Sequence, residues 1–503
     1  MLKITRIILA VLSLLAVTAL FVDVTGFAMH HWAWMAKIQL IPALLSLNLV
    51  VLAALIALAL VFGRIYCSII CPLGVYQDVV NRISTACRPR RKRKLGKFHS
   101  KPAANMMRNT FFIVFALLIA GHLISLPIYI ASLIEPYSAF GRMATWLVKP
   151  GVVEINNALA DSGNTAFVHA SMPHLSIPAL AVAAITFIIV TAMAWTSGRD
   201  YCNKICPVGW LLGKLSKFAL LKINIDTDRC NGCGSCARHC KASCIDPKTH
   251  TIDYTRCVTC FDCIGECTQH AISYSPVRKS QEAAPRKTTD KSRRAFLSGG
   301  AVVVASLAAE AIDKTTDGGL APIKSKRPSA SSIRIVPAGA KGAKSLSERC
   351  TACQLCITNC PNSVLRPSEA LDSLMQPVMA FNEGWCRPEC TVCGDVCPVG
   401  AIEPVDLAVK SSTKIGTATV DLDRCISAAY GQTCGNCARR CPAEAITMIP
   451  VSENGGNLRP MVDENACIGC GSCEYHCPVG RAGNIPGETA AIHVEGIDIH
   501  HLI

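Results

Sequence analysis

The sequence predicts a membrane α-helical half followed by cysteine-rich domains of mixed α+β structure. Three observations carry this prediction: 51% of the 503 residues are hydrophobic, long uncharged apolar runs recur in the first 195 residues, and many of the 30 cysteines stand at short fixed spacings. Only 17% of the residues are charged, against about 25% in an average soluble chain, which excludes a disordered chain. Disulfide scaffolds are usually short and secreted, so the spacing indicates metal instead.

Four apolar runs define the membrane half: residues 5–22, 38–62, 110–134 and 177–195. Each is long enough, or nearly so, to cross ~30 Å of hydrocarbon as a helix of about 20 residues. The alternative is a set of buried helices in a soluble protein, but four such runs in so short a stretch are hard to bury. We therefore expect a membrane domain of four helices over residues 1–215.

The loop at residues 87–101 sets the orientation, because it carries eight basic residues and no acidic one. The positive-inside rule places such a loop in the cytoplasm. A nucleic-acid patch is the alternative, but the position beside two membrane segments favours topology, and no nucleic-acid partner is expected. Residues 23–37 and 135–176 then face outside, and the chain returns to the cytoplasm after Trp195.

A repeat follows the second and fourth runs. Residues 63–74 read GRIYCSIICPLG and residues 198–209 read GRDYCNKICPVG, which match at eight of twelve positions. The repeat divides the membrane domain into two helical hairpins of the same orientation. Residues i and i+4 share a face of a helix, so each motif turns two thiols the same way. Cys67, Cys71, Cys202 and Cys206 form either a further iron–sulfur site or a metal-free pair of dithiols.

The segment 216–275 holds two motifs of the form Cys-x2-Cys-x2-Cys-x3-Cys. Ferredoxins with two [4Fe–4S] clusters use this spacing, in which three close cysteines bind one cluster and the fourth binds the other. Zinc sites pair two short spacings and do not use eight regularly spaced cysteines. We expect one cluster on Cys230, Cys233, Cys236 and Cys267 and the other on Cys257, Cys260, Cys263 and Cys240.

Four more motifs lie in residues 314–503, and a proline follows the last cysteine of each. Their spacing leaves open which motifs exchange the fourth cysteine. Twenty-four cysteines thus predict six clusters in α+β ferredoxin-like domains, and a cluster on the membrane repeat would raise the number to seven. Cys87 and Cys244 remain, and we expect both to be unligated buried thiols. The four motifs are Cys350, Cys353, Cys356, Cys360; Cys386, Cys390, Cys393, Cys397; Cys425, Cys434, Cys437, Cys441; and Cys467, Cys470, Cys473, Cys477.

The segment 276–313 joins the two cysteine-rich domains. Arg293-Arg294 and the apolar stretch to Ala309 are similar to a twin-arginine export signal, which we expect to remain as a fifth, anchoring helix. An amphipathic or buried soluble helix is the alternative. Export of a folded, cofactor-loaded domain avoids exposing bare thiols to an oxidising compartment. Residues 314–503 are then periplasmic, and residues 216–275 lie on the cytoplasmic side of the inner membrane.

The motifs carry a resemblance over nearly the whole chain. Residues 1–280 resemble the NapH family of membrane ferredoxin-type subunits, and residues 290–503 resemble the exported four-cluster ferredoxins of the NapG/MauM family. The resemblance implies a fused, menaquinol-oxidising pair that supplies electrons to periplasmic nitrate reductase or a similar carrier, within a larger membrane complex. Related four-cluster proteins commonly nest the cysteine exchange, pairing the first motif with the fourth and the second with the third.

The first functional hypothesis is therefore a quinol dehydrogenase whose substrate is the membrane quinol pool. A proton acceptor must stand near the quinol, and the candidates are His122, Glu135, His30 and His31. His122 ranks first because an ionisable group at membrane depth is a functional candidate. For His30 and His31, beside two tryptophans, the alternative role is to anchor a helix end at the interface.

Two other hypotheses remain at this point. The chain is either an accessory or maturation factor that sends cytoplasmic reducing power to a periplasmic metalloenzyme, or an electron-storage module. The topology raises a difficulty for the first two hypotheses, since roughly 30 Å of hydrocarbon separates the cytoplasmic clusters from the exported ones. No Cys-x-x-Cys-His motif is present to bind a covalent haem that would bridge this gap.

Overall fold

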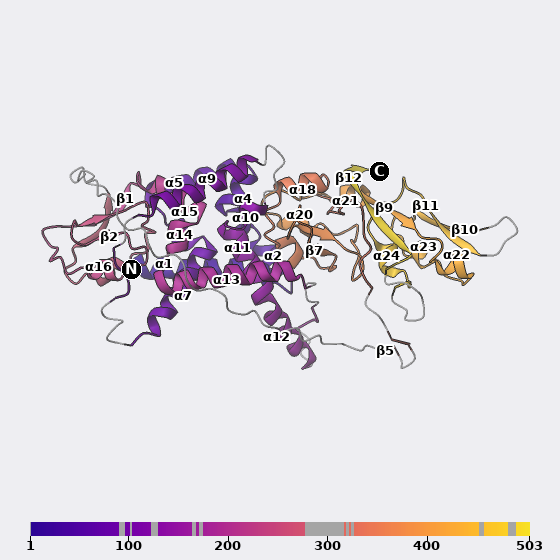
Figure 1. Ribbon diagram of the computed structural model, residues 1–503, viewed down its shortest axis with the longest axis horizontal. Coiled ribbons are helices and arrows are strands. Elements are labelled where there is room, and N and C mark those ends of the chain that lie inside the picture. The colour runs from indigo at the N-terminus through magenta and orange to yellow at the C-terminus, as the bar shows by residue number, and fades with distance from the viewer. Residues whose placement is uncertain are drawn as a thin grey trace.

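The computed structural model describes residues 2–89, 96–100, 103–121, 129–162, 167–170, 175–276, 316–317, 321–322, 326–451, 457–480 and 489–503. A helical domain occupies the centre of the elongated molecule, and a small domain made of strands and short helices lies at each end (Figure 1). Residues 221–276 form the left-hand end and residues 326–503 the right-hand end. The predicted anchor around Arg293 and Arg294 lies outside the described residues.

Among the described residues, two helices of the central domain are long and apolar enough to cross a membrane. They are α1 (Leu2–Val22) and α13 (Ile177–Ser197). Two shorter apolar helices accompany them, α5 (Leu49–Phe62) and α9 (Asn105–Gly121). The remaining helices of this domain are α2 (Phe27–Trp32), α3 (Trp34–Lys37), α4 (Leu40–Leu45), α6 (Tyr66–Ile69), α7 (Pro72–Ala86), α10 (Tyr129–Ser132), α11 (Pro136–Met143), a π-helical turn (Ala144–Val148), α12 (Lys149–Asp161), α14 (Asp200–Lys204) and α15 (Pro207–Ser216).

The prediction of one helix over residues 38–62 is wrong, because this segment is broken between α4 and α5. Leu47 adopts a left-handed conformation with φ of 54°, and the Asn48 side chain accepts a hydrogen bond from the Val51 amide. An asparagine at this position satisfies a free amide at the start of a helix and so favours a new helix over continuation. In the third predicted run, α9 ends at Gly121 and residues 122–128 lie outside the described part.

The left-hand domain is a small α+β unit. Strands β1 (Leu221–Ile225) and β4 (Ile272–Pro276) pair antiparallel, as do β2 (Ile245–Asp246) and β3 (Thr251–Ile252). The one-turn helices α16 (Ser235–Arg238) and α17 (Asp262–Glu266) each carry part of a cysteine motif. The buried apolar residues Ile223, Phe261 and Ile272 form its small core together with several cysteines.

The right-hand domain repeats this design twice. Its antiparallel pairs are β7 (Leu365–Pro367) with β8 (Pro377–Met379), β9 (Thr413–Val420) with β12 (Ile492–Leu502), and β10 (Ile446–Pro450) with β11 (Leu458–Val462). A short pair, β5 (Thr316–Asp317) and β6 (Ala321–Pro322), precedes it. Its helices are α18 (Ala343–Arg349), α19 (Leu355–Thr358), α20 (Val392–Val396), α21 (Leu407–Ser412), α22 (Ile426–Tyr430), α23 (Asn436–Arg439) and α24 (Ser472–His476).

Helix α1 connects the two end domains. Near its start, the Lys3 ammonium lies 3.2 Å from the Asp262 carboxylate of the left-hand domain. Near its end, the carbonyl oxygens of Leu20 and Phe21 accept hydrogen bonds from Asn359 and Thr358 of the right-hand domain. A helix of 21 residues is about 30 Å long at 1.5 Å per residue. The two end domains therefore stand about one hydrocarbon thickness apart along this helix.

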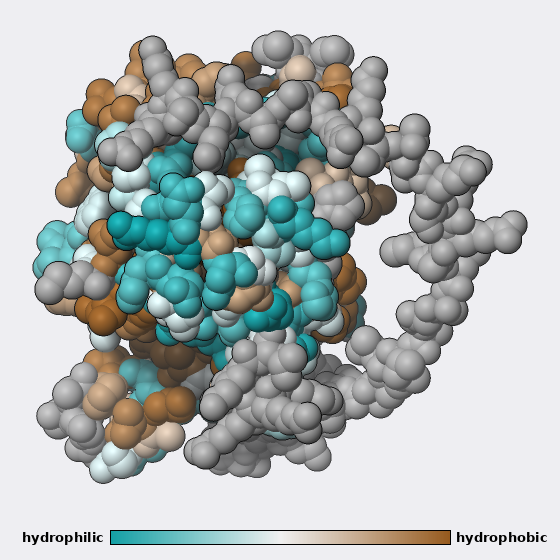
Figure 2. All heavy atoms as spheres, turned by 90° about the vertical axis from the view of Figure 1, so that its left-hand side faces the viewer, coloured by the Kyte–Doolittle hydropathy of each residue, from teal (hydrophilic) through white to brown (hydrophobic). Residues whose placement is uncertain are grey.

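The helical domain has an extensive exposed apolar surface. Large apolar side chains are exposed on α1, α5, α9 and α13, among them Leu12, Val50, Leu117 and Ile188. Figure 2 looks onto the left-hand end of the molecule, where hydrophilic residues gather over the centre and hydrophobic ones lie toward the edges. An exposed apolar surface of this extent is unusual for a soluble monomer.

Candidate iron–sulfur sites

The cysteines of the left-hand domain line two pockets. Cys267 joins the trio of the first motif, and Cys240 joins the trio of the second. Each pocket thus combines three thiols of one motif with the fourth thiol of the other motif, as ferredoxin spacing predicts. We call the outer group site 1 and the group nearer the helical domain site 2. Site 1 is Cys230, Cys233, Cys236 and Cys267; site 2 is Cys257, Cys260, Cys263 and Cys240.

The right-hand domain contains four further groups of four thiols, each made by two consecutive motifs. Burial and the charges of Cys350, Cys353 and Cys397 raise the pKa of Cys356, so Cys397 belongs with the first trio. Burial and the charges of Cys386, Cys360 and Cys390 likewise raise the pKa of Cys393. These two groups are site 4 (Cys350, Cys353, Cys356, Cys397) and site 5 (Cys386, Cys390, Cys393, Cys360).

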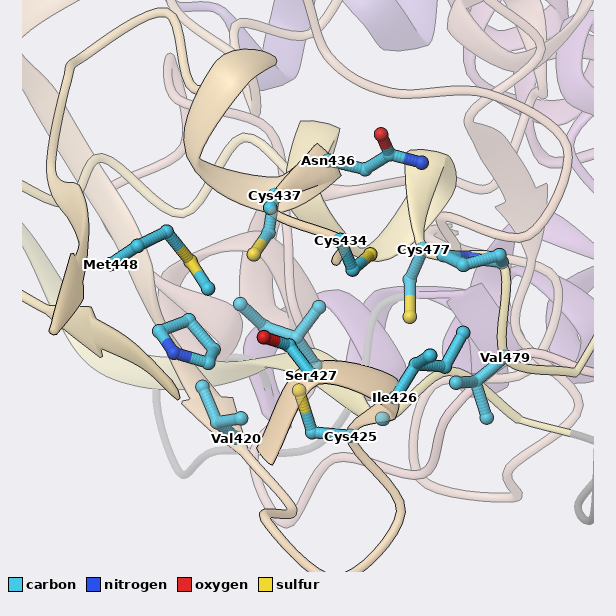
Figure 3. Close-up of a pocket in the computed structure, with 15 residues that line it drawn as sticks. Val420, Cys425, Ile426, Ser427, Cys434, Asn436, Cys437, Met448, Cys477 and Val479 are labelled. Carbon is cyan, nitrogen blue, oxygen red and sulfur yellow. The ribbon is translucent and has the colours of Figure 1, made fainter. Parts of the chain in front are cut away.

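The third and fourth motifs exchange in the same way. Figure 3 shows the sulfur atoms of Cys425, Cys434, Cys437 and Cys477 turned toward one apolar pocket, which Val420, Met448 and Val479 also line. The remaining thiols of this pair of motifs line a separate pocket. We call the latter site 6 (Cys467, Cys470, Cys473, Cys441) and the former site 7 (Cys425, Cys434, Cys437, Cys477).

The nested exchange implied by related proteins is therefore wrong for this chain. The motifs pair in sequence order, first with second and third with fourth. The connection between the first two motifs is short and folds into the β7–β8 pair, and that between the last two folds into β10–β11. Each antiparallel pair turns the chain back on itself, so that consecutive motifs lie next to each other.

Sites 5 and 6 join the two halves of the right-hand domain. The Cys386 amide donates a hydrogen bond of 2.9 Å to the Cys470 carbonyl. Burial, with the neighbouring charges of Cys441 and Cys386, raises the pKa of Cys470 to about 12. Site 4 is the group closest to the helical domain, since Arg142 of α11 donates to the Ala352 carbonyl next to Cys353. The order along the domain is thus site 4, site 5, site 6 and site 7.

The membrane repeat brings its four thiols together inside the helical domain, and we call this group site 3. Cys67, Cys71, Cys202 and Cys206 are all buried, with exposed fractions of 3–6%. The thiols of Cys71 and Cys206 lie close enough to those of Cys67 and Cys202 for their charges to interact. Gln77 Nε2 lies 3.2 Å from Cys202 Sγ, and the Gly209 amide lies 3.4 Å from Cys206 Sγ.

The two repeats hold each other through a crossed pair of arginines. Arg64 of the first repeat donates to the Cys202 carbonyl at 3.3 Å, and Arg199 of the second donates to the Cys67 carbonyl at 2.7 Å. Both side chains are fully buried. A Cβ on Gly209 would stand 2.0 Å from the Cys202 carbonyl oxygen and 2.9 Å from Arg64 Nη2, so only glycine permits this approach.

Charge and donor chemistry at site 3 fit an iron–sulfur cluster. The guanidinium groups of Arg64 and Arg199 each lie 3.9 Å from a thiol, those of Cys67 and Cys202. Four thiolates around a cube leave roughly two negative charges, which two buried cations offset. Among the described residues no three His, Cys, Asp or Glu side chains are placed to hold a single metal ion, as a zinc site requires.

Asp78 connects site 3 to site 2, a role the sequence analysis missed. This buried carboxylate lies 2.7 Å from Arg199, 2.9 Å from Arg6 and 2.9 Å from Lys241. Lys241 stands directly after Cys240, where proline is usual, and it also lies 3.1 Å from Asp262. A lysine in place of the usual proline is the sequence signal that could have indicated this contact between the domains.

The predicted quinone residues do not share one environment. His122 lies outside the described residues. Glu135 is buried, and its carboxylate accepts hydrogen bonds from the Tyr137 and Ser138 amides at the start of α11. His30 and His31 lie on the exposed side of α2, where the His31 ring stacks on Phe27. The structure thus places Glu135 between sites 3 and 4 and both histidines at the surface.

The spare cysteines differ from the expectation of two buried thiols. Cys87 is exposed at the end of α7, because the helix stops there and the chain continues into the basic loop, so the expectation is wrong for this residue. Cys244 is buried, and it lines the pocket of site 2.

Known protein families match three parts of the chain. A family described as a 4Fe-4S binding domain matches residues 46–97 and 179–226, which contain the two halves of site 3. A family described as a 4Fe-4S dicluster domain matches residues 432–481. The first matches include both copies of the Cys-x3-Cys-Pro motif, which favours the iron–sulfur interpretation of site 3.

Individual relatives place the chain in a family. The ferredoxin-type protein MauM of methylamine utilisation from Methylobacillus flagellatus is 32% identical over 165 residues, which is 31% of this chain and 69% of the relative. The ferredoxin-type protein NapG from Escherichia coli is 31% identical over 179 residues, 32% of this chain and 76% of the relative. The chain belongs to the MauM and NapG family of ferredoxin-type proteins. A member of this family is an iron–sulfur electron-transfer protein. No solved structure matches the chain.

Proposed function

We propose that the chain is a membrane-spanning electron-transfer protein in which seven iron–sulfur sites form one row from a cytoplasmic to a periplasmic domain. The observation that carries this proposal is the position of site 3 between site 2 and site 4. Arg64, Arg199 and Asp78 link it to the left-hand domain, and Arg142 links its other side to site 4. When bound, each cluster would take up and release one electron.

The placement in a membrane rests on the surface and on the basic loop. The exposed apolar faces of α1, α5, α9 and α13 lie in the helical domain between the two end domains, and hydrophilic residues cover the centre of the left-hand end (Figure 2). The amides of Lys97 and Phe98, from the basic loop, donate to the Arg238 carbonyl of the left-hand domain. The loop and this domain thus lie on the same side, which the positive-inside rule assigns to the cytoplasm.

In this proposal, site 3 carries electrons across the ~30 Å of hydrocarbon that separates the two end domains. Between sites 3 and 4, hydrogen bonds hold several polar side chains in place. The Tyr201 hydroxyl, beside Cys202, donates to the Ile134 carbonyl at 2.9 Å. Arg142 donates to the carbonyls of Ser132 and Ala352, so it ties α11 to the loop that carries Cys353.

The route favours transfer of cytoplasmic reducing power to a periplasmic partner. The family resemblance implies a periplasmic acceptor such as nitrate reductase, and the name of the MauM relatives adds methylamine utilisation as a second context for the partner. Such a partner would dock near site 7, at the end of the row. This direction corresponds to the accessory role among the hypotheses above.

Quinol oxidation is a second candidate, and the observation that favours it is Glu135. This ionisable group lies at depth between sites 3 and 4, near Arg142, where a proton acceptor for quinol is needed. Its carboxylate already caps α11, however, which is a sufficient structural reason for its presence. A test with two electron donors therefore decides whether the chain oxidises quinol.

Iron analysis and two electron donors test the proposal on the purified full-length chain. Seven cubes predict about 28 iron atoms per chain and six predict about 24. The double variant Cys71→Ala/Cys206→Ala should lose about four iron atoms, whereas Cys87→Ala, an exposed cysteine outside every site, should lose none. A double variant with the wild-type iron content would contradict a cluster at site 3.

The donor test separates the two candidates. A reduced cytoplasmic ferredoxin should reduce the whole row in the wild type, and only sites 1 and 2 in Cys71→Ala/Cys206→Ala. If a menaquinol analogue reduces sites 4 to 7 equally well in both proteins, quinol enters on the periplasmic side and the second candidate is correct. Failure of the ferredoxin to reduce the wild type would contradict the first.

A further inference from the structure

Site 2 contains a fifth cysteine. Cys244 lines the same pocket as the four thiols of site 2, and its Sγ lies 3.5 Å from Cys240 Sγ. Both residues are buried, with exposed fractions of 3% and 7%. Cys244 also interacts with the Cys257 thiol on the other side of the pocket. A thiol in this position faces the space that a cluster would fill.

The local fold holds this fifth thiol firmly. After Cys240 the chain turns through Ser243, whose φ is 50° and whose amide donates to the Cys240 carbonyl at 2.9 Å. The Cys244 carbonyl then accepts from the Asp253 amide at 2.8 Å, where β2 and β3 meet. The tight turn and the strand pair fix the two sulfur atoms next to each other.

The other motifs of the same chain provide an internal comparison. In four of the other five motifs the residue four positions after the last cysteine is apolar and small or medium-sized, and in the fifth it is Arg481, which lies outside the described residues. A thiol at this position is therefore not required to build the fold, since alanine or valine serves in these four motifs. The equivalents of Cys244 are Ala271, Val364, Ala401 and Ala445.

We propose that Cys244 is a reserve ligand of site 2. Its S–H group donates a hydrogen bond to the Cys240 sulfur, and its thiolate can replace Cys240 as the ligand. The two sulfur atoms lie 3.5 Å apart, so a change of side-chain rotamer brings the Cys244 sulfur toward the position of the Cys240 sulfur. On replacement, the Cys244 proton passes to the departing Cys240 thiolate, or to solvent in a Cys240→Ala variant, and the Cys244 thiolate would bind the iron atom that Cys240 has left. This proposal rests on the cluster proposed at site 2.

The consequence concerns the direction of electron flow. Hydrogen bonds to the sulfur atoms of a cluster stabilise its reduced form and raise its reduction potential. Site 1 has an alanine, Ala271, at the equivalent position and lacks this donor. Site 2, the one nearer the helical domain, should therefore have the higher potential of the two, which draws electrons from the cytoplasmic end toward site 3.

Four variants of the full-length chain test the inference through iron content and redox titration followed by electron paramagnetic resonance. Cys244→Ala introduces the residue of the sister motifs, so it should keep its iron and lower the midpoint potential of one cluster. Cys240→Ala should keep its iron as well, because Cys244 takes over. Cys240→Ala/Cys244→Ala should lose iron from one site, and Cys267→Ala, which has no second thiol nearby, should also lose iron.

The outcomes are distinct. Equal iron content in Cys240→Ala and Cys267→Ala contradicts the proposed replacement. Loss of iron in Cys244→Ala alone means that Cys244, not Cys240, is the ligand, which overturns the assignment. An unchanged midpoint potential in Cys244→Ala contradicts the hydrogen bond. The iron content of the wild type reports separately on whether the proposed clusters are present, because it does not depend on Cys244.

Discussion

Arg64 and Arg199 show how single residues determine what site 3 can hold. Four thiols in a buried space repel one another once ionised, so a cluster there requires nearby positive charge. Arg199 shares its charge with Asp78, whereas Arg64 donates to the neutral Asn203 and to the carbonyls of Cys202 and Thr255. The charge of Arg64 is therefore the more available of the two to a cluster.

Replacing Arg64 by glutamine should lower the midpoint potential of the site 3 cluster, because the positive charge 3.9 Å from Cys67 Sγ is removed. The change also leaves buried carbonyls without a donor, at a cost of about 1–3 kcal/mol for each unsatisfied group. Arg64→Lys keeps the charge and should restore most of the potential. Redox titration measures the shift; a potential that falls equally in both variants would indicate a purely structural role.

Lys410 should tune site 5 in a similar way. Its ammonium is buried and lies 3.3 Å from Cys386 Sγ, and its positive charge partly offsets the rise that burial causes in the pKa of Cys386. Lys410→Met should therefore lower the midpoint potential of one cluster in the right-hand domain. Lys414→Met is the matched control, since Lys414 is also buried but donates to the Glu464 carbonyl. The same shift in both variants would contradict the assignment.

At the scale of elements, the cysteine motifs were readable from sequence but the connections between them were not. Ferredoxin spacing predicted the groupings at sites 1 and 2, because short loops fix which thiols meet. The pairing in the right-hand domain depends on the β7–β8 and β10–β11 strands, which are too short to leave a clear pattern. The sequence analysis also missed the break at Asn48, because a single capping residue can start a new helix within a long apolar run.

The contact between α7 and the left-hand domain depends on Asp78. Asp78→Asn should leave Arg6, Arg199 and Lys241 without their shared buried carboxylate, and removing one partner of a buried ion pair costs about 3–5 kcal/mol. We expect faster proteolysis of the left-hand domain and a lower melting temperature in detergent.

The matched control for this variant is Asp200→Asn. Asp200 pairs with Lys204 one turn along α14, and the lysine side chain is 31% exposed. Such a pair contributes at most about 1 kcal/mol. If both variants are cleaved at the wild-type rate, Asp78 does not hold the domains together.

At the scale of the whole molecule, the structure bears on how electrons could pass between clusters that are expected on opposite sides of a membrane. The sequence placed two clusters on one side of a membrane and four on the other, and it left open whether the repeated Cys-x3-Cys-Pro motif bound a metal. Sequence spacing could not place that motif in depth, because the position follows from how α6 packs against α1 and how α14 packs against α13 and α9. The four thiols meet between the two end domains, which is the observation behind the proposed row from site 1 to site 7.

The central claim is that electrons pass through site 3 from one end of the chain to the other. The direct measurement uses vesicles that carry the full-length chain, with ferricyanide trapped inside and dithionite added outside. We predict that the wild type and Cys87→Ala reduce the trapped ferricyanide, whereas Cys71→Ala/Cys206→Ala does not. Reduction at the wild-type rate by the double variant, or no reduction by the wild type, would contradict the claim.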